Sequence, residues 1–571
     1  MRKNFSFRKK KSTKKFLFLA ILFFLIFIFW DLWQKFFLAN SKMVPADGGI
    51  FTEATVGKIK NLNPLAENSS DFDRDVQKLI FAGLLKYDPT SGQIVDGLAN
   101  LRISNDAKKY FLTLKNSARF SDGEKISVDD VLFTFETLLQ NPHFPNKNLH
   151  DAFEYVTINV VDERTVEFVL PEKNIFFRSF LTTPILPKKY FSDEILLEEI
   201  VDPNLPFNKK PVGAGPFFLK NIVPNDDGSA RIFLQKNKFF YRGAPKIDKI
   251  VFYVFPDFEN LNFSSPWTTM FSRIPAAHLE KFEKKFLDEY FRREYILPRW
   301  IAIFFNLEKN FTKYRNFRRA LFSATDKKKI LERERGWTPI DSFFFFENIN
   351  EFFEKDFSAA RKFLRDGGFP FDKKKEIRTF GRDGDPISLK IITSISPPIF
   401  SRIAQNLAQS WERELNFPVK TEILDEKNFL LALQNRDFDA AFFGQNFSQN
   451  FDAVSMWHSI AGEKFNLSNL KNPDVDFLID EIRFAGAQSD LFLLNEKINE
   501  IAPAVPIATP KYFLLVSKKL QNFSENFGKL RAHADRFFGV ENWFFAKKRE
   551  WNWPENSSKI FGFFKFIFSE K

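Results

Sequence analysis

The side chains best suited to hold a ligand follow a short apolar segment in the last third of the chain. Residues 438–444 are apolar and aromatic, which predicts a buried strand. Residues 445–450 follow with uncharged amides and a hydroxyl around one phenylalanine, and Trp457 and His458 come soon after. Open α/β sheets bind ligands beyond the carboxyl ends of their strands, so this loop is a candidate binding edge. A surface turn capped by its own side chains is the alternative.

No catalytic arrangement accompanies this loop. The sequence lacks the Gly-x-Ser-x-Gly, phosphate-loop and His-Glu-x-x-His motifs, and its five histidines stand far apart. It contains no cysteine, which excludes disulfides, thiolate catalysis, cysteine zinc sites and a lipid-modified cysteine. Asp129 and Asp130 fit the first turn of a helix, where the helix dipole favours acids. We therefore expect a binding protein and not an enzyme, with no cofactor and no metal.

The elements that must position the loop alternate between strand and helix. The apolar patterns predict strands at residues 387–392, 418–424 and 438–444. Helices are predicted between them, at residues 403–415 and 427–434. This βαβαβ order predicts a half-sheet with helices on both faces, which ends on the candidate loop.

Three further elements are predicted in the first half of the chain. A helix is expected from about Asp73 to Tyr87, where a proline follows and stops it. Residues 110–115 alternate as a half-buried strand. Ser127 opens another helix, with Asp130 in the capping-box position three residues later.

The N-terminus has the composition of a membrane-spanning segment. Residues 1–15 form a cytoplasmic tip with eight basic side chains and no acid, and the apolar residues 16–38 follow. A helix of that length rises about 35 Å, enough to cross the roughly 30 Å hydrocarbon core. The basic tip predicts a single-pass cell-membrane protein with an extracytoplasmic body, joined through a linker at residues 39–49. Cleavage as a signal peptide, giving a secreted protein, is the alternative.

The positive charge of the chain does not indicate a nucleic-acid partner. The formal net charge is +12, but eight positive charges belong to the N-terminal tip. In the remainder, 76 basic residues face 72 acidic ones, which gives no general attraction for a polyanion. The length of 571 residues, with 44% hydrophobic content, predicts about two to four globular domains.

Several motifs resemble, in order, those of the extracellular solute-binding protein family 5, the oligopeptide-, dipeptide- and nickel-binding component of ABC importers. They lie at residues 79–88, 97–99, 121–123, 129–134, 211–217, 304–306 and 317–326. Ala214 stands where the family's Gly-Thr-Gly-Pro-Tyr turn usually has threonine. The resemblance covers about residues 50–545.

The resemblance implies a two-lobed α/β fold of the periplasmic-binding-protein type, class II, behind one transmembrane helix. The implied bounds are residues 50–305 for lobe one, about 90–205 for a subdomain inserted in it, 306–511 for lobe two and 512–550 for the return to lobe one. The hinge would lie at Phe305 and Asn306. Residues 551–571 lie beyond the resemblance, as either a strand on lobe one or a membrane-touching segment.

The resemblance also assigns ligand contacts. Peptides in this family are held as an extended strand between the lobes, largely by main-chain hydrogen bonds. The implied contacts are Asn68, Ser69 and Ser70 in lobe one, and Phe443, Gly444, Gln445 and Asn446 in lobe two. The candidate loop itself adds Phe447 and Trp457 to the predicted ligand contacts. Peptide binders of the family have an aspartate after the glycine, where it pairs with the ligand's α-ammonium. Here Gln445 has that place, and a neutral amide lacks the strength of a carboxylate. Asp452 is predicted to replace the family's aspartate if the loop takes another route.

The resemblance thus predicts a monomer that captures an oligopeptide or another small solute, closes a hinge over it and docks on the permease subunits of an ABC transporter. A nickel–chelator complex, haem or an oligosaccharide are the alternative ligands. A sensor or chaperone role on the same fold, tethered to the membrane, is the alternative function.

Overall fold

The structure, a computed structural model, contains two compact units. One joins Met1–Gly49 to Phe544–Lys571, and the other is Ile50–Trp543. The structure describes residues 9–39, 41–67, 69–192, 197–261, 268–276, 278–279, 288–344, 355–381, 383–446, 453–461, 466–486, 488–523 and 530–551.

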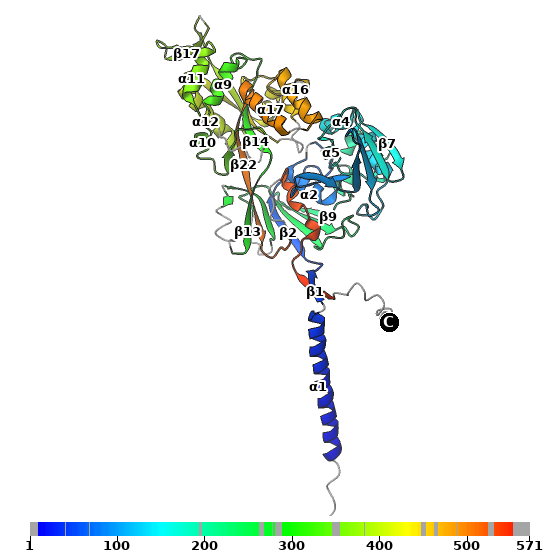
Figure 1. The fold of residues 1–571 in the computed structure, drawn as a ribbon. Coiled ribbons are helices and arrows are strands. Elements are labelled where there is room, and N and C mark those ends of the chain that lie inside the picture. Colours follow the sequence, from blue (N-terminus) through cyan, green and yellow to red (C-terminus); the bar gives the residue numbers. More distant parts are fainter. Residues whose placement is uncertain are drawn as a thin grey trace, which may run out of the picture. The chain divides into compact units, whose positions relative to one another are not determined.

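The first unit combines one long helix with a two-stranded ribbon (Figure 1). Helix α1 (Lys9–Ala39) contains the apolar segment Phe16–Ala39, which is long and apolar enough to cross a membrane and is not buried. A signal sequence has the same properties. Strand β1 (Ser41–Pro45) follows and pairs antiparallel with β23 (Lys547–Trp551), so that Ser41 lies opposite Trp551.

The second unit is organised around one twelve-stranded sheet in the order β20-β19-β21-β14-β22-β12-β2-β11-β10-β9, with β13 and β15 also paired to β22. Its strands are β2 (Ile50–Val56), β9 (Phe217–Pro224), β10 (Ala230–Lys236), β11 (Lys249–Phe255), β12 (Met270–Pro275), β13 (Tyr290–Ile296), β14 (Arg299–Phe305), β15 (Trp337–Pro339), β19 (Leu389–Ser394), β20 (Val419–Leu424), β21 (Ala440–Asn446) and β22 (Ala504–Ser517).

Strand β22 belongs to both halves of this sheet. Its first part pairs with β14 and β15, and its second part with β12 and β13. We call the half with β2 and β9 to β13 lobe one, and the half with β14, β15 and β19 to β21 lobe two (Figure 1). Leu297 and Pro298 connect β13 to β14, so a second chain segment crosses between the lobes beside β22. The crossing is therefore a pair of adjacent strands.

Lobe two contains the predicted βαβαβ unit, in which β19 is parallel to both β20 and β21. Its helices and short strands are α9 (Arg315–Ser323), α10 (Lys327–Ile330), α11 (Phe357–Asp366), β16 (Phe371–Asp372), β17 (Ile377–Phe380), β18 (Asp385–Pro386), α12 (Pro398–Leu415), α13 (Glu426–Gln434), α14 (Val454–Trp457), η3 (Ser459–Ala461), α16 (Pro473–Phe484) and α17 (Gln488–Ile501). Trp411 on α12 is fully buried against one face of the sheet. Strand β21 extends to Asn446, so the expected loop begins later than the sequence predicted.

Lobe one carries helix α2 (Asp71–Ile80), whose start is fixed by a capping box between Ser70 and Asp73. The sequence prediction that this helix continues to Tyr87 was wrong. The chain turns extended at Phe81, and residues 85–88 form strand β3. The apolar side chains there satisfy a half-buried strand as well as a helix, and the tertiary pairing of β3 with β4 decided between them.

The remaining elements of lobe one include a four-stranded antiparallel sheet, β5-β6-β8-β7 (blue to cyan in Figure 1). They are β3 (Leu85–Asp88), β4 (Gln93–Asp96), β5 (Ala99–Ile103), β6 (Lys109–Leu114), α3 (Val128–Leu132), the π-helix η1 (Phe133–Leu139), α4 (Lys147–Phe153), β7 (Thr157–Asp162), β8 (Thr165–Val169), α5 (Phe177–Phe180), η2 (Lys188–Tyr190), α6 (Leu197–Ile200), α7 (Pro206–Lys209), η4 (His533–Phe537) and η5 (Val540–Asn542). The capping box of Ser127 and Asp130 is present as predicted. The domain bounds given above stay predictions.

The Gly-Ala-Gly-Pro turn packs against the end of α2. The amide of Gly215 donates to the carbonyl of Ile80 at 2.7 Å. A Cβ on Gly215 would lie 2.4 Å from the carbonyl oxygen of Leu79, so only glycine permits this approach. The motif therefore fixes the C-terminal end of the helix whose N-terminal end carries the predicted ligand residues.

Candidate ligand-binding site

Strand β21 supplies the lobe-two side of the candidate site and leaves part of one edge open. One edge pairs with β14 along its whole length. The other pairs with β19 only from Ala440 to Phe442. From Phe443 to Asn446, this second edge has no partner strand among the described residues. Such an edge can accept an extended chain through main-chain hydrogen bonds.

Gln445 lies at this open end of β21 and is opposite Trp300 of β14. Directly opposed residues of an antiparallel pair point to the same face, so the two side chains are neighbours. Gln445 is half-buried, and its Oε1 is buried without a hydrogen-bond partner among the described residues. The indole nitrogen of Trp300 is in the same condition. Buried polar atoms normally have partners, so these two atoms mark a place where a ligand or water can bind.

Phe443 and Trp457 line the same face from further along. Phe304 stacks on Phe443 at 4.9 Å between ring centroids and on Trp457 at 6.1 Å. Trp457 is only 1% exposed, so its ring supports the wall from behind. The structure thus brings Phe443, Gln445 and Trp457 together, as the sequence predicted from their proximity in the chain.

The other lobe-two residues on the predicted list differ in position. Gly444 is exposed and points to the opposite face, where a Cβ would lie 3.0 Å from the ring of Phe400. The main chain of Asn446 pairs with Arg299. Phe447 and Asp452 lie outside the described residues, as does Asn68 in lobe one.

Ser69 and Ser70 stand immediately before α2, and their hydroxyls are already engaged. The Ser70 hydroxyl accepts from the amide of Asp73 at 3.0 Å and donates to the Lys58 carbonyl at 2.8 Å. The Ser69 hydroxyl accepts from the Gln77 side-chain amide at 2.9 Å. These side chains hold the turn, so a ligand contact at this segment would have to use its main chain.

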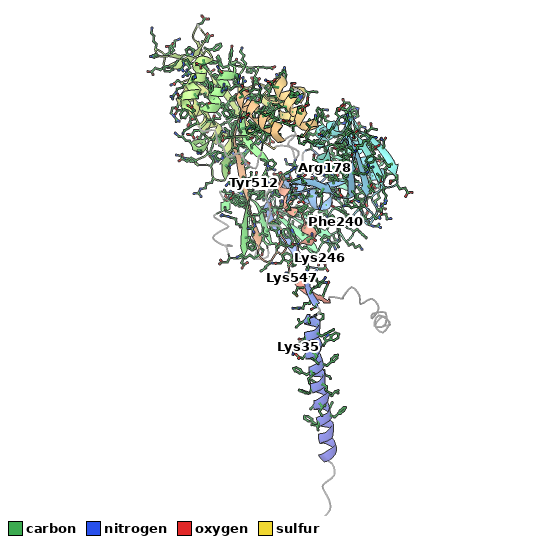
Figure 2. All side chains as sticks on the ribbon, viewed as in Figure 1. Lys35, Arg178, Phe240, Lys246, Tyr512 and Lys547 are labelled. Atoms are coloured by element: carbon green, nitrogen blue, oxygen red, sulfur yellow. The ribbon has the colours of Figure 1, made fainter. Side chains whose placement is uncertain are left out.

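Arg299 joins the two predicted segments. Its main chain pairs with Asn446, while its guanidinium donates to the Asp71 carboxylate at 2.5 Å. Asp71 is the first residue of α2 and follows Ser70 directly. Tyr512, on the crossing strand β22 (labelled in Figure 2), lies 3.4 Å from the same guanidinium through its hydroxyl. The side chains of Arg299 and Asp71 are 20% and 30% exposed, so solvent and a ligand can reach the pair.

His533 completes this cluster from η4. Its Nδ1 lies 2.6 Å from the Tyr295 hydroxyl, and its ring packs edge-on against Tyr512 at 4.5 Å. Burial, opposed in part by Asp71, lowers the pKa of His533 well below its ordinary value. Burial acts to raise the pKa of Asp71, but the hydrogen bond and positive charge of Arg299, with the charge of Arg273, hold that pKa below its usual range. At neutral pH the cluster therefore contains an ionised Asp71, a cationic Arg299 and a neutral His533.

A second group of charges lies deeper in lobe one and ties α2 to the sheet. Arg536 is fully buried and bonds both carboxylate oxygens of Asp75 at 2.7 Å and Glu53 at 2.6 Å. Arg273 pairs with Asp75 as well. Burial and the neighbouring Arg536 lower the pKa of Arg273 to about 10. Two cations and two anions balance, which is the condition under which charges tolerate burial.

The residues expected to form the hinge lie inside lobe two. The Phe305 amide donates to Pro503, and the Asn306 side chain donates to the Arg436 carbonyl at 3.1 Å. Both residues are buried. Their role as a hinge stays a prediction, and the strands change lobes several residues earlier, at Leu297 and Pro298.

A cavity of about 500 Å³ lies in lobe one beside α2, within the range of small-molecule pockets. Ser69 contributes to its wall, together with Tyr87, Tyr241 and Lys86. Burial and the nearby Arg242 lower the pKa of Lys86 to about 8. The cavity thus continues from the predicted lobe-one segment and offers aromatic and cationic surface.

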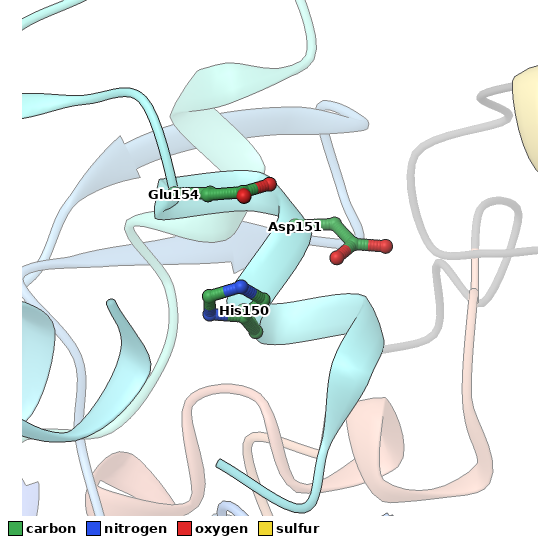
Figure 3. Close-up of side chains that lie close together, drawn as sticks. All are labelled: His150, Asp151 and Glu154. Atoms are coloured by element: carbon green, nitrogen blue, oxygen red, sulfur yellow. The ribbon is translucent and has the colours of Figure 1, made fainter. Parts of the chain in front are cut away.

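One group of possible metal ligands lies in lobe one. The side chains of His150, Asp151 and Glu154 project from the short helix α4 and its end, and their possible ligand atoms lie within 4.8 Å of one another (Figure 3). The Nδ1 of His150 is 2.9 Å from the Leu139 carbonyl, and Asp151 pairs with Lys147 at 2.7 Å. Two of the three side chains are therefore already engaged by local contacts.

Arg299, Asp71 and His533 are the site residues that the sequence alone did not identify. Asp71 lies just before the predicted start of its helix and was not singled out, and Arg299 lies in an apolar strand segment 228 positions away from it. No local spacing signals such a pair. The polar end of a buried strand, by contrast, was visible in the sequence.

Comparison with known proteins identifies the family and the fold. The family model for bacterial extracellular solute-binding proteins, family 5, matches residues 93–466. The oligopeptide-binding protein AppA of Bacillus subtilis is 23% identical over 524 residues, covering 88% of this chain and 93% of AppA.

Two solved structures show the same two-lobed fold. AppA from Bacillus subtilis, in complex with a nonapeptide, has a TM-score of 0.69 at 21% identity and covers 88% of this chain and 100% of its own. NikZ from Campylobacter jejuni, in complex with Ni(L-His), has a TM-score of 0.69 at 20% identity with the same coverage. The predicted fold class is thereby confirmed. With its family model matched over well more than half of its length, the chain belongs to the bacterial extracellular solute-binding proteins of family 5.

Proposed function

We propose that this protein is the substrate-binding component of an ABC transporter and that its ligand is a peptide, held between the lobes. The observation that carries the proposal is the open edge of β21 from Phe443 to Asn446, which has no partner strand among the described residues. An extended peptide would add to that edge through its main chain, which gives affinity for many sequences. Family membership and the peptide bound by AppA support this choice.

The ligand's polar groups would meet the side chains at the end of that edge. Gln445 Oε1 is a buried acceptor without a partner among the described residues, and Trp300 Nε1 is a matching donor. Arg299 and Asp71 lie at the crossing between the two segments and remain partly exposed. A ligand that bridges these groups would contact both lobes at once, and closure about the crossing strands would then enclose it.

A non-peptide ligand is the second candidate, and Gln445 favours it. A carboxylate at this position would pair with a peptide α-ammonium, whereas an amide has no charge to offer. NikZ shows that the fold can hold Ni(L-His). The same binding site would then take a chelated metal or another neutral or anionic solute.

Native mass spectrometry of the full chain in detergent tests the proposal directly. A co-purifying mass that fragments into amino-acid residues supports the peptide, and a metal-containing or carbohydrate mass supports the second candidate. Gln445→Leu should weaken binding of that ligand about 5- to 10-fold, because a buried acceptor loses its hydrogen bond. Exposed Gln521→Leu is the matched control. Unchanged affinity in Gln445→Leu would contradict the placement of the site.

Attachment to the membrane and delivery to a permease are further parts of the proposal. Helix α1 would remain uncleaved as a single-pass anchor, with the basic tip in the cytoplasm. Intact mass measurement of the protein from the membrane fraction decides this point. A mass that includes residues 1–38 is expected, and a shorter chain in the soluble fraction would identify a signal peptide.

A further inference from the structure

A short loop of lobe one contacts lobe two outside the crossing strands. The loop connects β8 to α5, and we call residues 174–176 within it the tip loop. The amide of Ile175 donates to the carbonyl of Arg483 at 3.0 Å. Arg483 belongs to the last turn of α16 in lobe two, where carbonyls have no partner within the helix. A main-chain hydrogen bond therefore joins the two lobes.

The tip loop is held in shape by its own part of lobe one. The Asn174 side-chain oxygen accepts from the amide of Phe176 at 2.9 Å, and the Asn174 carbonyl accepts from the amide of Phe177 at 3.1 Å. Tyr110 of β6 donates its hydroxyl to the same carbonyl at 3.3 Å and packs on the Phe177 ring at 5.0 Å. Because none of these contacts involves lobe two, we expect the loop to keep its shape when the lobes separate.

Gly486 permits the close approach of the tip loop to α16. It follows the end of α16 at φ +80°, a conformation that favours glycine after a helix. A Cβ on Gly486 would lie 3.1 Å from Cγ2 of Ile175, so a larger side chain would push against the loop. Ile175 itself is 37% exposed. The contact is therefore shallow enough to break when the lobes rotate.

Phe176 connects this contact to the candidate ligand site. Its side chain is partly buried and packs against the lobe-two apolar cluster that contains Trp300 and Trp457. Phe443 packs on the same cluster, and Trp300 lies opposite Gln445. A side chain of lobe one thus supports the lobe-two wall of the site while the tip loop is docked.

We propose that the tip loop is a latch, which docks on the end of α16 when the lobes close and determines how long a captured ligand is retained. The proposal deepens the proposed function and rests on capture by closure. Rotation about the crossing strands separates the tip loop from α16, breaks the bond from Ile175 to Arg483 and withdraws Phe176 from the cluster. Opening therefore loosens the wall of the site and releases the ligand.

A disulfide tests the contact, because the chain has no native cysteine. Ile175→Cys is combined with Gly486→Cys in the full chain in detergent, since the two side chains start close enough for a disulfide. The matched control combines Ile175→Cys with Gly368→Cys, because Gly368 follows another lobe-two helix at φ +84° with nothing within 4 Å. We expect diamide to oxidise the first pair about ten-fold faster than the control pair. Equal rates would overturn the proposal.

Retention of peptides tests the role as a latch. A tryptic digest of casein is added before or after oxidation, and the bound peptides are quantified by mass spectrometry after dialysis. A disulfide closed after the addition should retain about ten-fold more peptide than the reduced protein, because release is blocked. A disulfide closed before the addition should exclude the peptides. If retention does not depend on the disulfide, the tip loop does not control release.

Gly486→Asn gives an independent test, because asparagine tolerates positive φ better than most side chains. Its side chain would meet Ile175, whereas Gly368→Asn, the matched control, places the same side chain in open space. We expect about three-fold faster peptide release from Gly486→Asn and an unchanged rate in the control; equal rates in the two variants would also overturn the latch. Failure of the proposed function looks different: the original chain would bind no peptide from the digest, and the latch is then judged by the disulfide alone.

Discussion

Gln445 is the residue at which we propose that the ligand's chemistry is decided. Its Oε1 is buried and unpartnered among the described residues, at the open end of β21. The resemblance to peptide binders places an aspartate there, and an amide accepts a hydrogen bond without attracting charge. The residue therefore distinguishes a peptide held by its main chain from one held by its α-ammonium.

Gln445→Asp tests that distinction. If a peptide α-ammonium lies beside this residue, the carboxylate should tighten binding of a peptide with a free N-terminus by about 1 kcal/mol, or roughly five-fold. An N-acetylated version of the same peptide should not gain. Isothermal titration calorimetry with both peptides measures the difference, and an equal response of the two would place the amine elsewhere.

His533 predicts how stability depends on pH. Its pKa is lowered in the folded state by burial, so between that value and about 6.5 only the unfolded chain binds the proton. Stability should therefore fall as pH decreases from 6.5, with a limiting slope of about 1.4 kcal/mol per pH unit. Asp71, whose pKa is also lowered, keeps its full contribution in this window because it loses it only in stronger acid.

Urea unfolding at pH 7.5, 6.5, 5.5 and 5.0 measures that slope. His533→Gln removes the titrating group and should reduce the slope by up to about 1.4 kcal/mol per pH unit, which is the contribution of one bound proton. Exposed His143→Gln is the matched control and should leave it unchanged. If His533→Gln and the original chain show the same slope, groups other than His533 cause the loss of stability in acid.

At the scale of elements, the features that depend on neighbouring residues could be predicted from the sequence. The capping box at Ser127 and the alternation of β6 were predicted from neighbouring residues, and the structure contains both. The capping box at Ser70 obeys the same local rule but was not predicted. The βαβαβ unit was also predicted, with strand ends differing by about two residues. The end of α2 was not, because pairing of β3 with β4 overrode an apolar pattern that fitted both structures.

The candidate site was only partly predictable for the same reason. A buried strand with a polar end could be read near position 445. The partners that surround it could not, since Arg299 and Asp71 are 228 positions apart and their contact depends on how the lobes join. Ser69 and Ser70 were predicted as ligand contacts, but their hydroxyls serve the start of α2.

The buried charges that fasten α2 to the sheet give a prediction at this scale. Arg536→Met leaves Asp75 and Glu53 buried with one cation between them, which should lower the free energy of unfolding by about 3–5 kcal/mol. Arg315→Met removes the exposed pair with Glu500 and should cost less than about 1 kcal/mol. Urea unfolding compares the two. A similar small loss in both would mean that water reaches Asp75 and Glu53.

At the scale of the whole molecule, strand β22 connects the two lobes mechanically because it belongs to both halves of the sheet. The crossing consists of residues 297–298 and the middle of β22, so relative motion is restricted to two adjacent segments. A crossing made of few segments favours rotation of the lobes about a hinge over the sliding of large packed faces past one another. We therefore expect ligand to change the angle between lobes while leaving each lobe's interior unaltered.

Energy transfer between dyes measures that closure. Asp226→Cys on the β9–β10 turn and Lys374→Cys near β17 are exposed positions on lobe one and lobe two, and the chain has no other cysteine to label. Ligand should raise the transfer efficiency between them. A matched pair within lobe one, Asp226→Cys with Thr90→Cys, should not respond. No ligand response in the first pair would exclude closure as the mode of capture.

The order of strands in the shared sheet also governs when each lobe can finish folding. Lobe one begins with β2 yet needs β22 and Arg536, which are among the last tenth or so of the chain to be synthesised. Until then, Glu53, Asp75 and Arg273 lack their balancing cation, and β12 lacks a neighbour. Contacts between residues this far apart form slowly. We therefore expect lobe one to complete its packing only after the last part of the chain has been synthesised.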